Sequence, residues 1–298
     1  MQPDEIRRIA NAILYEGYML YPYRPSAFKN QRPGWSFGTL LPPAYAERNP
    51  GDSAFMEGQM LMSGAQGANL NTDIRFLQLR ETAGESPMEQ TASLIIPIKE
   101  LLQRGQKTQF CSENGEGTTV EGLVEIDASP VSDSALRLTV RVSNRSNLLE
   151  PPATRDAALK YSLVAAHAIV QTDRGEFVSL LDPPEELRIE TAACRQTGVF
   201  PVLIGDEGTR TNMLLSPIIL GDYPRIAPES PGDFFDSAEI DELLTLRLLT
   251  LADSEKEELR SAGEITSNLL NRTQACTPQD LLRMHGAIRE RAVEKEQS

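Results

Sequence analysis

The chain is poor in the side chains that most often carry chemistry. Its 298 residues include only two His and three Cys, and Cys111, Cys194 and Cys276 lie far apart without a C-x-x-C pair. A structural zinc site needs several such ligands close together, and a disulfide framework needs cysteines that pair. The sequence therefore predicts no resident metal, no cofactor and no disulfide. Reduced thiols fit a cytoplasmic location best.

Long apolar runs and positive charge are also scarce. The longest apolar stretches, such as SLVAAHAIV at 162–170, fall well short of the roughly 20 residues that span a bilayer. The start of the chain, MQPDEIRRIANAILYEGYMLYP, lacks the pattern of a signal peptide. With 29 basic and 43 acidic residues the net charge is −14, whereas nucleic-acid binding needs clustered Lys and Arg. We expect no membrane insertion and no nucleic-acid partner.

What the chain does contain is a globular composition and a middle region patterned as strands. Hydrophobic residues make up 40% of it and charged residues 24%, which is ample for a core. Apolar and polar residues alternate at 72–80, 118–126 and 135–143, as they do in half-buried strands. We also expect a hairpin that joins 160–171 to 176–181. A second strand pair is expected at 201–205 and 211–220.

Helical periodicity marks both ends of the chain. Apolar residues in 3–20 recur at steps of three and four, and Asp236-Ser-Ala-Glu239 has the spacing of a capping box before an apolar stripe. A short helix is expected at 184–195. The fold class that follows is α+β: a central antiparallel β-sandwich or barrel-like domain with an N-terminal helix and a C-terminal helical region. The expected parts, packed as one unit, are a helix with an irregular aromatic and basic segment (1–52), the β domain (53–221), and an acidic loop with C-terminal helices (222–298).

The first candidate binding surface is the segment 14–35, in which aromatic and basic side chains are crowded. Tyr, Trp and Arg are enriched at the energetic centres of protein interfaces. The alternative is that the rings cover one edge of the β domain and that Arg24 pairs with the acidic loop. The residues assigned here as partner-contact candidates are Tyr15, Tyr18, Tyr21, Tyr23, Arg24, Lys29, Arg32 and Trp35.

The second candidate is the segment 216–242, which places seven carboxylates in a proline-rich stretch. These groups fit a solvated acidic loop, a protein-contact surface, or an acid/base or hard-cation site. Asp236 and Glu239 are already explained by capping, and no residue is assigned a catalytic, cofactor-binding or metal-binding role. His167, in an alternating stretch, is expected to be a packed strand residue. The partner-contact candidates here are Asp222, Tyr223, Glu229 and Asp233.

Several segments together resemble a bacterial protein family associated with gene clusters for actinobacterial-type high-affinity nickel–iron hydrogenases. The segments are ILYEGYMLYPYRPSAFKNQ, RFLQLR, FVSLLDPPEELR, SPIILGDYPRIAPESPGDFFDSAEIDELLTLRLLTL and LLRMHGAIRE. The resemblance covers nearly the whole chain. It implies a cytoplasmic accessory protein whose partners are hydrogenase subunits or other hydrogenase accessory proteins, and it carries no site residues with it.

A non-enzymatic role agrees best with these features. A protein that donates nickel would be expected to show the His and Cys ligands in which this chain is poor. The expected function is therefore that of an assembly, scaffold or chaperone-like protein for a nickel–iron hydrogenase. Two alternatives stay open: a stable structural subunit of the hydrogenase complex, or an enzyme that uses the carboxylates of 222–242 with Arg24 or Lys29.

Overall fold

The computed structural model describes residues 6, 7, 9–11, 13, 14, 38–80, 87–115 and 117–224. The chain divides into two compact units, 1–224 and 225–298, and all described residues belong to the first. Its elements are α2 (Pro43–Ala46), β1 (Phe55–Ser63), β2 (Asn69–Gln78), β3 (Met88–Pro97), α3 (Ile98–Gln103), β4 (Gln106–Glu113), β5 (Thr119–Pro130), β6 (Ala135–Asn144), α4 (Arg155–Leu159), β7 (Val164–Thr172), β8 (Glu176–Phe177), the 3-10 helix η1 (Glu185–Leu187), α5 (Arg188–Ala192), β9 (Gln196–Thr197), β10 (Phe200–Leu203) and β11 (Asn212–Ser216).

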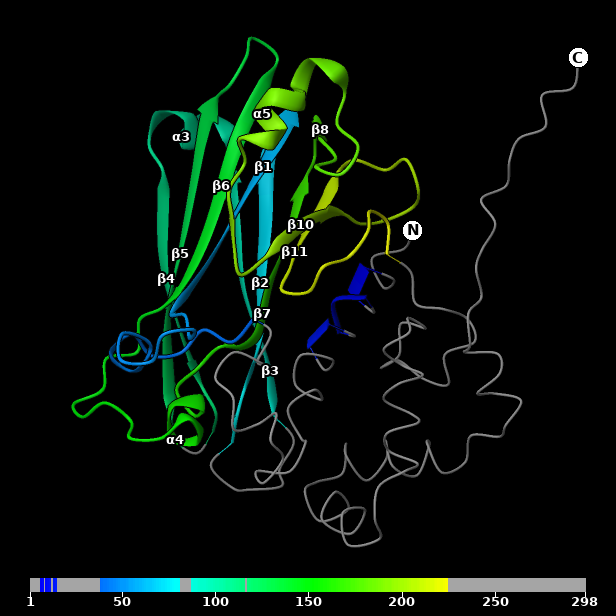
Figure 1. Ribbon diagram of the computed structural model, residues 1–298. Coiled ribbons are helices and arrows are strands. Elements are labelled where there is room, and N and C mark those ends of the chain that lie inside the picture. Colours follow the sequence, from blue (N-terminus) through cyan, green and yellow to red (C-terminus); the bar gives the residue numbers. More distant parts are fainter. Residues whose placement is uncertain are drawn as a thin grey trace, which may run out of the picture. The chain divides into compact units, whose positions relative to one another are not determined.

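The strands form two antiparallel sheets that pack face to face (Figure 1). Sheet 1 has the strand order β4-β5-β6-β1-β8, with β9 also paired to β1, and sheet 2 has the order β10-β11-β7-β2-β3. A single hydrophobic core joins inward side chains of both sheets, among them Met60 and Leu138 of sheet 1 and Ile74 and Leu215 of sheet 2. The prediction of an antiparallel β-sandwich or barrel-like domain is thus confirmed as to its antiparallel β architecture, and the described residues form the two-sheet arrangement.

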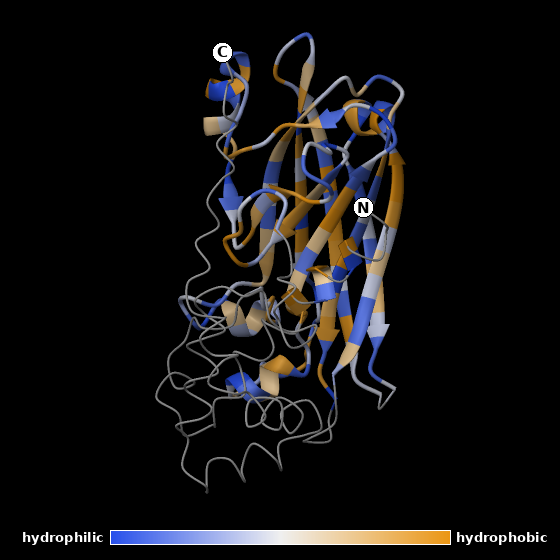
Figure 2. Ribbon diagram, turned by 90° about the vertical axis from the view of Figure 1, so that its right-hand side faces the viewer, coloured by the Kyte–Doolittle hydropathy of each residue, from blue (hydrophilic) through white to orange (hydrophobic). Residues whose placement is uncertain are grey.

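Alternating hydropathy explains why these segments form strands, and Figure 2 shows hydrophobic and hydrophilic bands succeeding each other along them. In β6 the inward residues Leu138, Val140 and Val142 are almost fully buried, whereas Thr139 and Arg141 between them are partly exposed. Burial of one face in this way drives sheet formation. The predicted strands at 72–80, 118–126 and 135–143 correspond to β2, β5 and β6.

The predicted hairpin of 160–171 with 176–181 is wrong. The first of these strands, β7, pairs with β2 and β11 in sheet 2, while β8 pairs with β1 in sheet 1. The turn between them carries the chain from one sheet to the other and is anchored by Asp173, whose carboxylate accepts the backbone N–H of Asn69 at 2.7 Å. Gly175 in this turn has a φ of +75°, and a Cβ there would lie 2.5 Å from the carbonyl oxygen of Ser63. The close approach therefore needs glycine.

The other local predictions in this region are confirmed. β10 and β11 pair antiparallel, with Val202 opposite Leu214. The short helix expected at 184–195 is present as η1 followed by α5. No helix among the described residues is both long enough and apolar enough to cross a membrane.

Near the start of the chain, the described residues between 6 and 14 have helical backbone and lie against sheet 2. Leu14 packs with Leu77 and Val164, and the side-chain oxygen of Asn11 accepts a hydrogen bond from Arg75 at 2.6 Å. The remaining positions of the predicted helix at 3–20 lie outside the described residues. So does the predicted C-terminal helical region, apart from residues 222–224.

His167 is a fully buried residue of β7, as the sequence predicted. Its Nδ1 lies 3.0 Å from the carbonyl oxygen of Ala165, so the neutral ring carries its proton on Nδ1 and donates it there. The pKa of His167 is lowered to about 3, chiefly by burial and to a smaller extent by the nearby Arg75 guanidinium, against the opposing effect of the Ala165 carbonyl. The imidazole is therefore uncharged at neutral pH.

Candidate functional site

The candidate site lies where the two sheets end on the same side of the sandwich. β3 is the last strand of sheet 2 and β4 the last strand of sheet 1, and α3 carries the chain from one to the other (Figure 1). Ile98 and Leu101 of α3 are buried and anchor this connection. Two strands that follow one another in sequence thus become the edges of two different sheets.

A cavity of about 260 Å³ lies between these strands. Phe76 of β2 and Val124 of β5 contribute from the neighbouring strands, and β3 and β4 supply the other lining residues. We call it the β3–β4 groove. Its lining residues, none of which carries a formal charge, are Phe76, Gln90, Thr91, Ala92, Ser93, Leu94, Thr108, Gln109, Phe110, Cys111, Ser112 and Val124.

The groove exists because the inward side chains of the two edge strands are incompletely covered. In β3, Ala92 and Leu94 are only half-buried, whereas Ile96, next to α3, is buried. In β4, Thr108 and Phe110 are likewise half-buried. Inward residues of the central strands are shielded by the opposite sheet, so the core is open to solvent along the β3–β4 side.

A glycine in β5 sets the position of the largest groove side chain. Phe110 is the cross-strand neighbour of Gly122, and a Cβ at position 122 would lie 2.0 Å from the Phe110 ring. Because Gly122 has no side chain, the ring can lie directly against β5. Its centroid is 5.7 Å from that of Phe76, in a tilted arrangement typical of favourable aromatic pairs. The two rings give the groove an apolar wall.

Hydrogen bonds close one end of the groove. Gln78 of β2 is fully buried, and its Nε2 donates to the carbonyl oxygen of Thr118 at 3.0 Å. Its Oε1 accepts from the Ser112 hydroxyl at 2.7 Å and from Gln90 Nε2 at 3.4 Å. Ser112 and Gln90 line the groove, so the Gln78 amide ties sheet 2 to sheet 1 and fixes two polar lining residues. Satisfied buried networks of this kind hold side chains rigidly.

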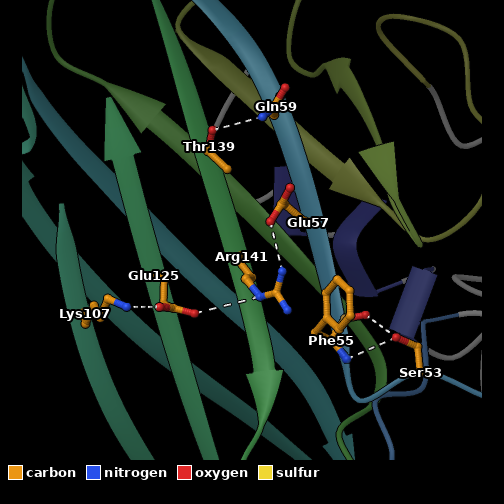
Figure 3. Close-up of polar contacts among 8 residues, drawn as sticks. All are labelled: Ser53, Phe55, Glu57, Gln59, Lys107, Glu125, Thr139 and Arg141. Carbon is orange, nitrogen blue, oxygen red and sulfur yellow. Dashed lines mark hydrogen bonds and ion pairs between the residues drawn. The ribbon is translucent and has the colours of Figure 1, made fainter. Parts of the chain in front are cut away.

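Two charged side chains beside the groove, one on each edge strand, have partners of opposite charge within their own sheets. Glu89 of β3 lies 3.4 Å from Arg75, and Lys107 of β4 lies 2.5 Å from Glu125. Figure 3 shows that the second pair begins a row across sheet 1, in which Arg141 reaches Glu125 at 3.8 Å and Glu57 at 3.2 Å. Opposite charges on neighbouring strands support the strand register. The lining of the groove itself contains no Asp, Glu, Lys or Arg side chain.

Two of the twelve partner-contact candidates, Asp222 and Tyr223, are described, and both fix the chain after β11. The Asp222 carboxylate accepts from the Ser179 hydroxyl at 2.5 Å and from the Leu203 backbone N–H at 2.8 Å. Tyr223 donates its backbone N–H to the Leu203 carbonyl oxygen at 2.7 Å, and its half-buried ring packs against the core. The other candidates, which lie outside the described residues, are Tyr15, Tyr18, Tyr21, Tyr23, Arg24, Lys29, Arg32, Trp35, Glu229 and Asp233. A partner role for these twelve residues stays a prediction.

Other reactive groups of the described region stand apart from one another. Cys111 is an exposed thiol on β4, and Cys194 is a half-buried thiol after α5. Burial raises the pKa of Cys194, an effect that Arg137 partly opposes, so its thiolate is disfavoured. No group of three or more His, Cys, Asp or Glu side chains positioned to hold a metal occurs among the residues the structure describes. The chemistry that the groove offers is binding by shape, apolar contact and neutral hydrogen bonds.

We compared the chain with known protein families and with curated proteins. No protein-family model matches the chain, and no curated protein matches it either.

Proposed function

We propose that the chain is a non-enzymatic accessory protein of a nickel–iron hydrogenase. It acts in the cytoplasm as a scaffold or chaperone-like factor that holds a hydrogenase subunit, or another hydrogenase accessory protein, during assembly. The link to hydrogenase comes from the resemblance of the sequence segments. The binding role comes from the fold.

One observation carries the binding role: the β3–β4 groove is a neutral, partly apolar cavity on a protein with a net charge of −14. Concave sites with aromatic walls and a few fixed polar groups are the usual places of ligand binding. Phe76 and Phe110 supply the apolar contact, and Gln90 and Ser112 are held in place by Gln78. Such a site recognises a neutral surface rather than transforming a substrate.

Affinity purification from the native host tests the proposal. The full chain is tagged in the chromosome, and the proteins that co-purify are identified by mass spectrometry under conditions in which the hydrogenase is produced. We expect hydrogenase subunits or other accessory proteins of its assembly to be enriched over a mock purification from the untagged strain. A deletion strain should make less active hydrogenase, although its structural genes are expressed.

The stoichiometry of the recovered complex separates the roles. An accessory protein is expected in complexes with immature subunits and to be missing from the purified mature enzyme. A fixed ratio in the mature enzyme would make the chain a structural subunit instead. Absence of every hydrogenase protein from the purification, with normal hydrogenase activity in the deletion strain, would refute the proposal.

A further inference from the structure

We propose that the β3–β4 groove binds an extended, uncharged segment of the partner protein, which adds to sheet 2 by main-chain pairing with the outer edge of β3. This inference rests on the proposed binding function and specifies the form of its partner. In this mode of recognition, main-chain hydrogen bonds supply affinity, and pockets for alternate side chains supply specificity.

The edge strands of the two sheets differ in how well they are protected against pairing with another chain. β8 has two residues, and β10 has four with Pro201 among them. β4 has eight residues and carries Lys107, whose side chain is 70% exposed. Short length, proline and lysine are the usual means by which proteins prevent an edge from pairing with another chain.

β3 has none of these protections along most of its length. It has ten residues, and the stretch from Gln90 to Ile96 contains neither a charged residue nor proline. In the described part of the chain its only strand partner is β2, and the side chain of Ile95 is 75% exposed. A long, neutral edge with an exposed apolar side chain is a ready template for another strand.

Charge favours a partner segment over a second copy of this chain. Each copy carries a net charge of −14, and like charge of that size opposes self-association. The lining of the groove and the stretch from Gln90 to Ile96 are uncharged, and the nearby Glu89 and Lys107 already have partners of opposite sign. A charged segment would lose its hydration there without gaining a counter-charge. The occupant that fits is neutral.

The groove also specifies the pattern of the segment. Side chains of a strand point alternately to the two faces of the sheet. One set of the added strand would therefore point inward beside Ala92 and Leu94 of β3 and towards Phe110 of β4, and the other set would continue the outer face of sheet 2 beside Thr91 and Ser93. The segment should have apolar residues at every second position and small polar residues between them.

Binding of synthetic peptides to the full chain tests this inference. The probes are three capped, fluorescein-labelled heptapeptides in which Leu or Val alternates with Thr or Ser, and binding is followed by fluorescence anisotropy. Controls replace the apolar residues with Lys, or place Pro at the central position. We expect the alternating peptides to bind at least about tenfold more tightly than either control. Hydrogen exchange should slow in β3 on binding and stay unchanged in β6.

Two matched variants locate the binding edge. Ile95→Lys adds a charge to the edge of β3, and Ile189→Lys makes the same change on α5, where the side chain is 82% exposed. We expect Ile95→Lys to weaken peptide binding about tenfold or more, because lysine guards an edge against pairing. Ile189→Lys should bind as the wild type does. Both variants should keep the wild-type melting temperature, since both side chains are already in solvent.

These experiments can reject strand addition at β3 without rejecting the proposed role in hydrogenase assembly. Failure of all three alternating peptides to bind, equal binding of the Lys peptide, or equal effects of the two variants would overturn it. Sedimentation that shows a dimer abolished by Ile95→Lys would also overturn it, in favour of a second copy. Co-purification of hydrogenase proteins that Ile95→Lys leaves intact would keep the proposed function and reject this edge as its site.

Discussion

The centre of the sandwich and its β3–β4 side are made from the same alternation of side chains but are covered to different degrees. In the centre, Ile74 of sheet 2 and Leu138 of sheet 1 are completely buried in the shared core. On the β3–β4 side, Leu94 and Phe110 face inward with the same periodicity and remain half-buried. Position within the sheet, and not the residue pattern alone, decides whether an inward face is closed off in the core or stays open to solvent.

Truncation of one leucine in each region should give the largest contrast. Leu138→Ala removes a fully buried side chain and is expected to lower the free energy of unfolding by about 2–5 kcal/mol. Leu94→Ala removes one that solvent already reaches, so its cost should be at most about half as large. Urea unfolding of both variants and the wild type measures the difference. Equal losses would show that the β3–β4 side is as closed as the centre.

The two sheets also differ in how their ionisable groups meet solvent, and the pH dependence of the unfolding free energy can test this difference. Sheet 1 carries paired, partly exposed charges on its outer face. In sheet 2, His167 of β7 is instead buried and neutral, with its pKa lowered from 6.5 to about 3. Since the unfolded chain binds the proton more readily, stability from this residue is complete above pH 6.5. It falls by up to about 1.4 kcal/mol per pH unit as the pH drops from 6.5 towards 3.

A variant without the imidazole isolates this effect. His167→Gln has no titrating group at this position, while the carboxylates that also contribute to acid unfolding are unchanged. Unfolding free energies at several pH values between 4 and 7 should therefore fall less steeply with acidity in the variant than in the wild type. Parallel curves would mean that His167 titrates in the folded protein as it does in the unfolded chain.

The smallest effect is expected from a hydroxyl in the central core. Thr72 lies between Leu70 and Ile74 on the inward face of β2 and is completely buried. Its Oγ1 has no hydrogen-bond partner within the part of the chain that the structure describes. Thr72→Val keeps the shape and removes the unsatisfied group, so we expect a gain of about 1 kcal/mol in unfolding free energy.

Thr139 on the outer face of sheet 1 provides the control for this change. Its hydroxyl accepts a long hydrogen bond of 3.4 Å from Gln59, and the residue is partly exposed. Thr139→Val should change the unfolding free energy by no more than about 0.5 kcal/mol. A loss of stability in Thr72→Val, measured by the same urea titrations, would contradict the view that its hydroxyl is unsatisfied.

The central strands could be predicted from sequence because their two faces differ strongly. β6 alternates large aliphatic residues with Arg and Thr, and this contrast matches its burial pattern. The turn after β7 departs from its sequence pattern for a physical reason: Thr172–Gly175 has the composition of a hairpin turn. Its direction, however, is set by the contact of Asp173 with Asn69, which is distant in sequence. Local turn chemistry does not say which sheet receives the next strand.

The candidate site was missed because its strands lack that contrast. β3 places Gln90 and Ala92 on its inward face and Thr91 and Ser93 on its outward face, so the hydropathy of the two sides is similar. β1 was missed as well, since its inward face uses methionines and Gly58 in place of β-branched residues. An edge strand whose inward side chains are only half-buried does not need a strongly apolar face, so its two faces differ little in hydropathy. The signal that could have found β3 is the uncharged run from Gln90 to Ile96.

The connection through α3 also bears on how such a site can change during evolution. Ten of the twelve lining residues of the groove belong to one continuous stretch, Met88–Glu113, which forms the edge of sheet 2, passes through one short helix and forms the edge of sheet 1. Closing so short a connection costs little chain entropy. Replacement of this one segment would change most of the groove lining at once, while the central strands would keep their pairings with one another. The lining of the groove is therefore concentrated in one exchangeable segment of the chain, separate from the strands that hold the sandwich together.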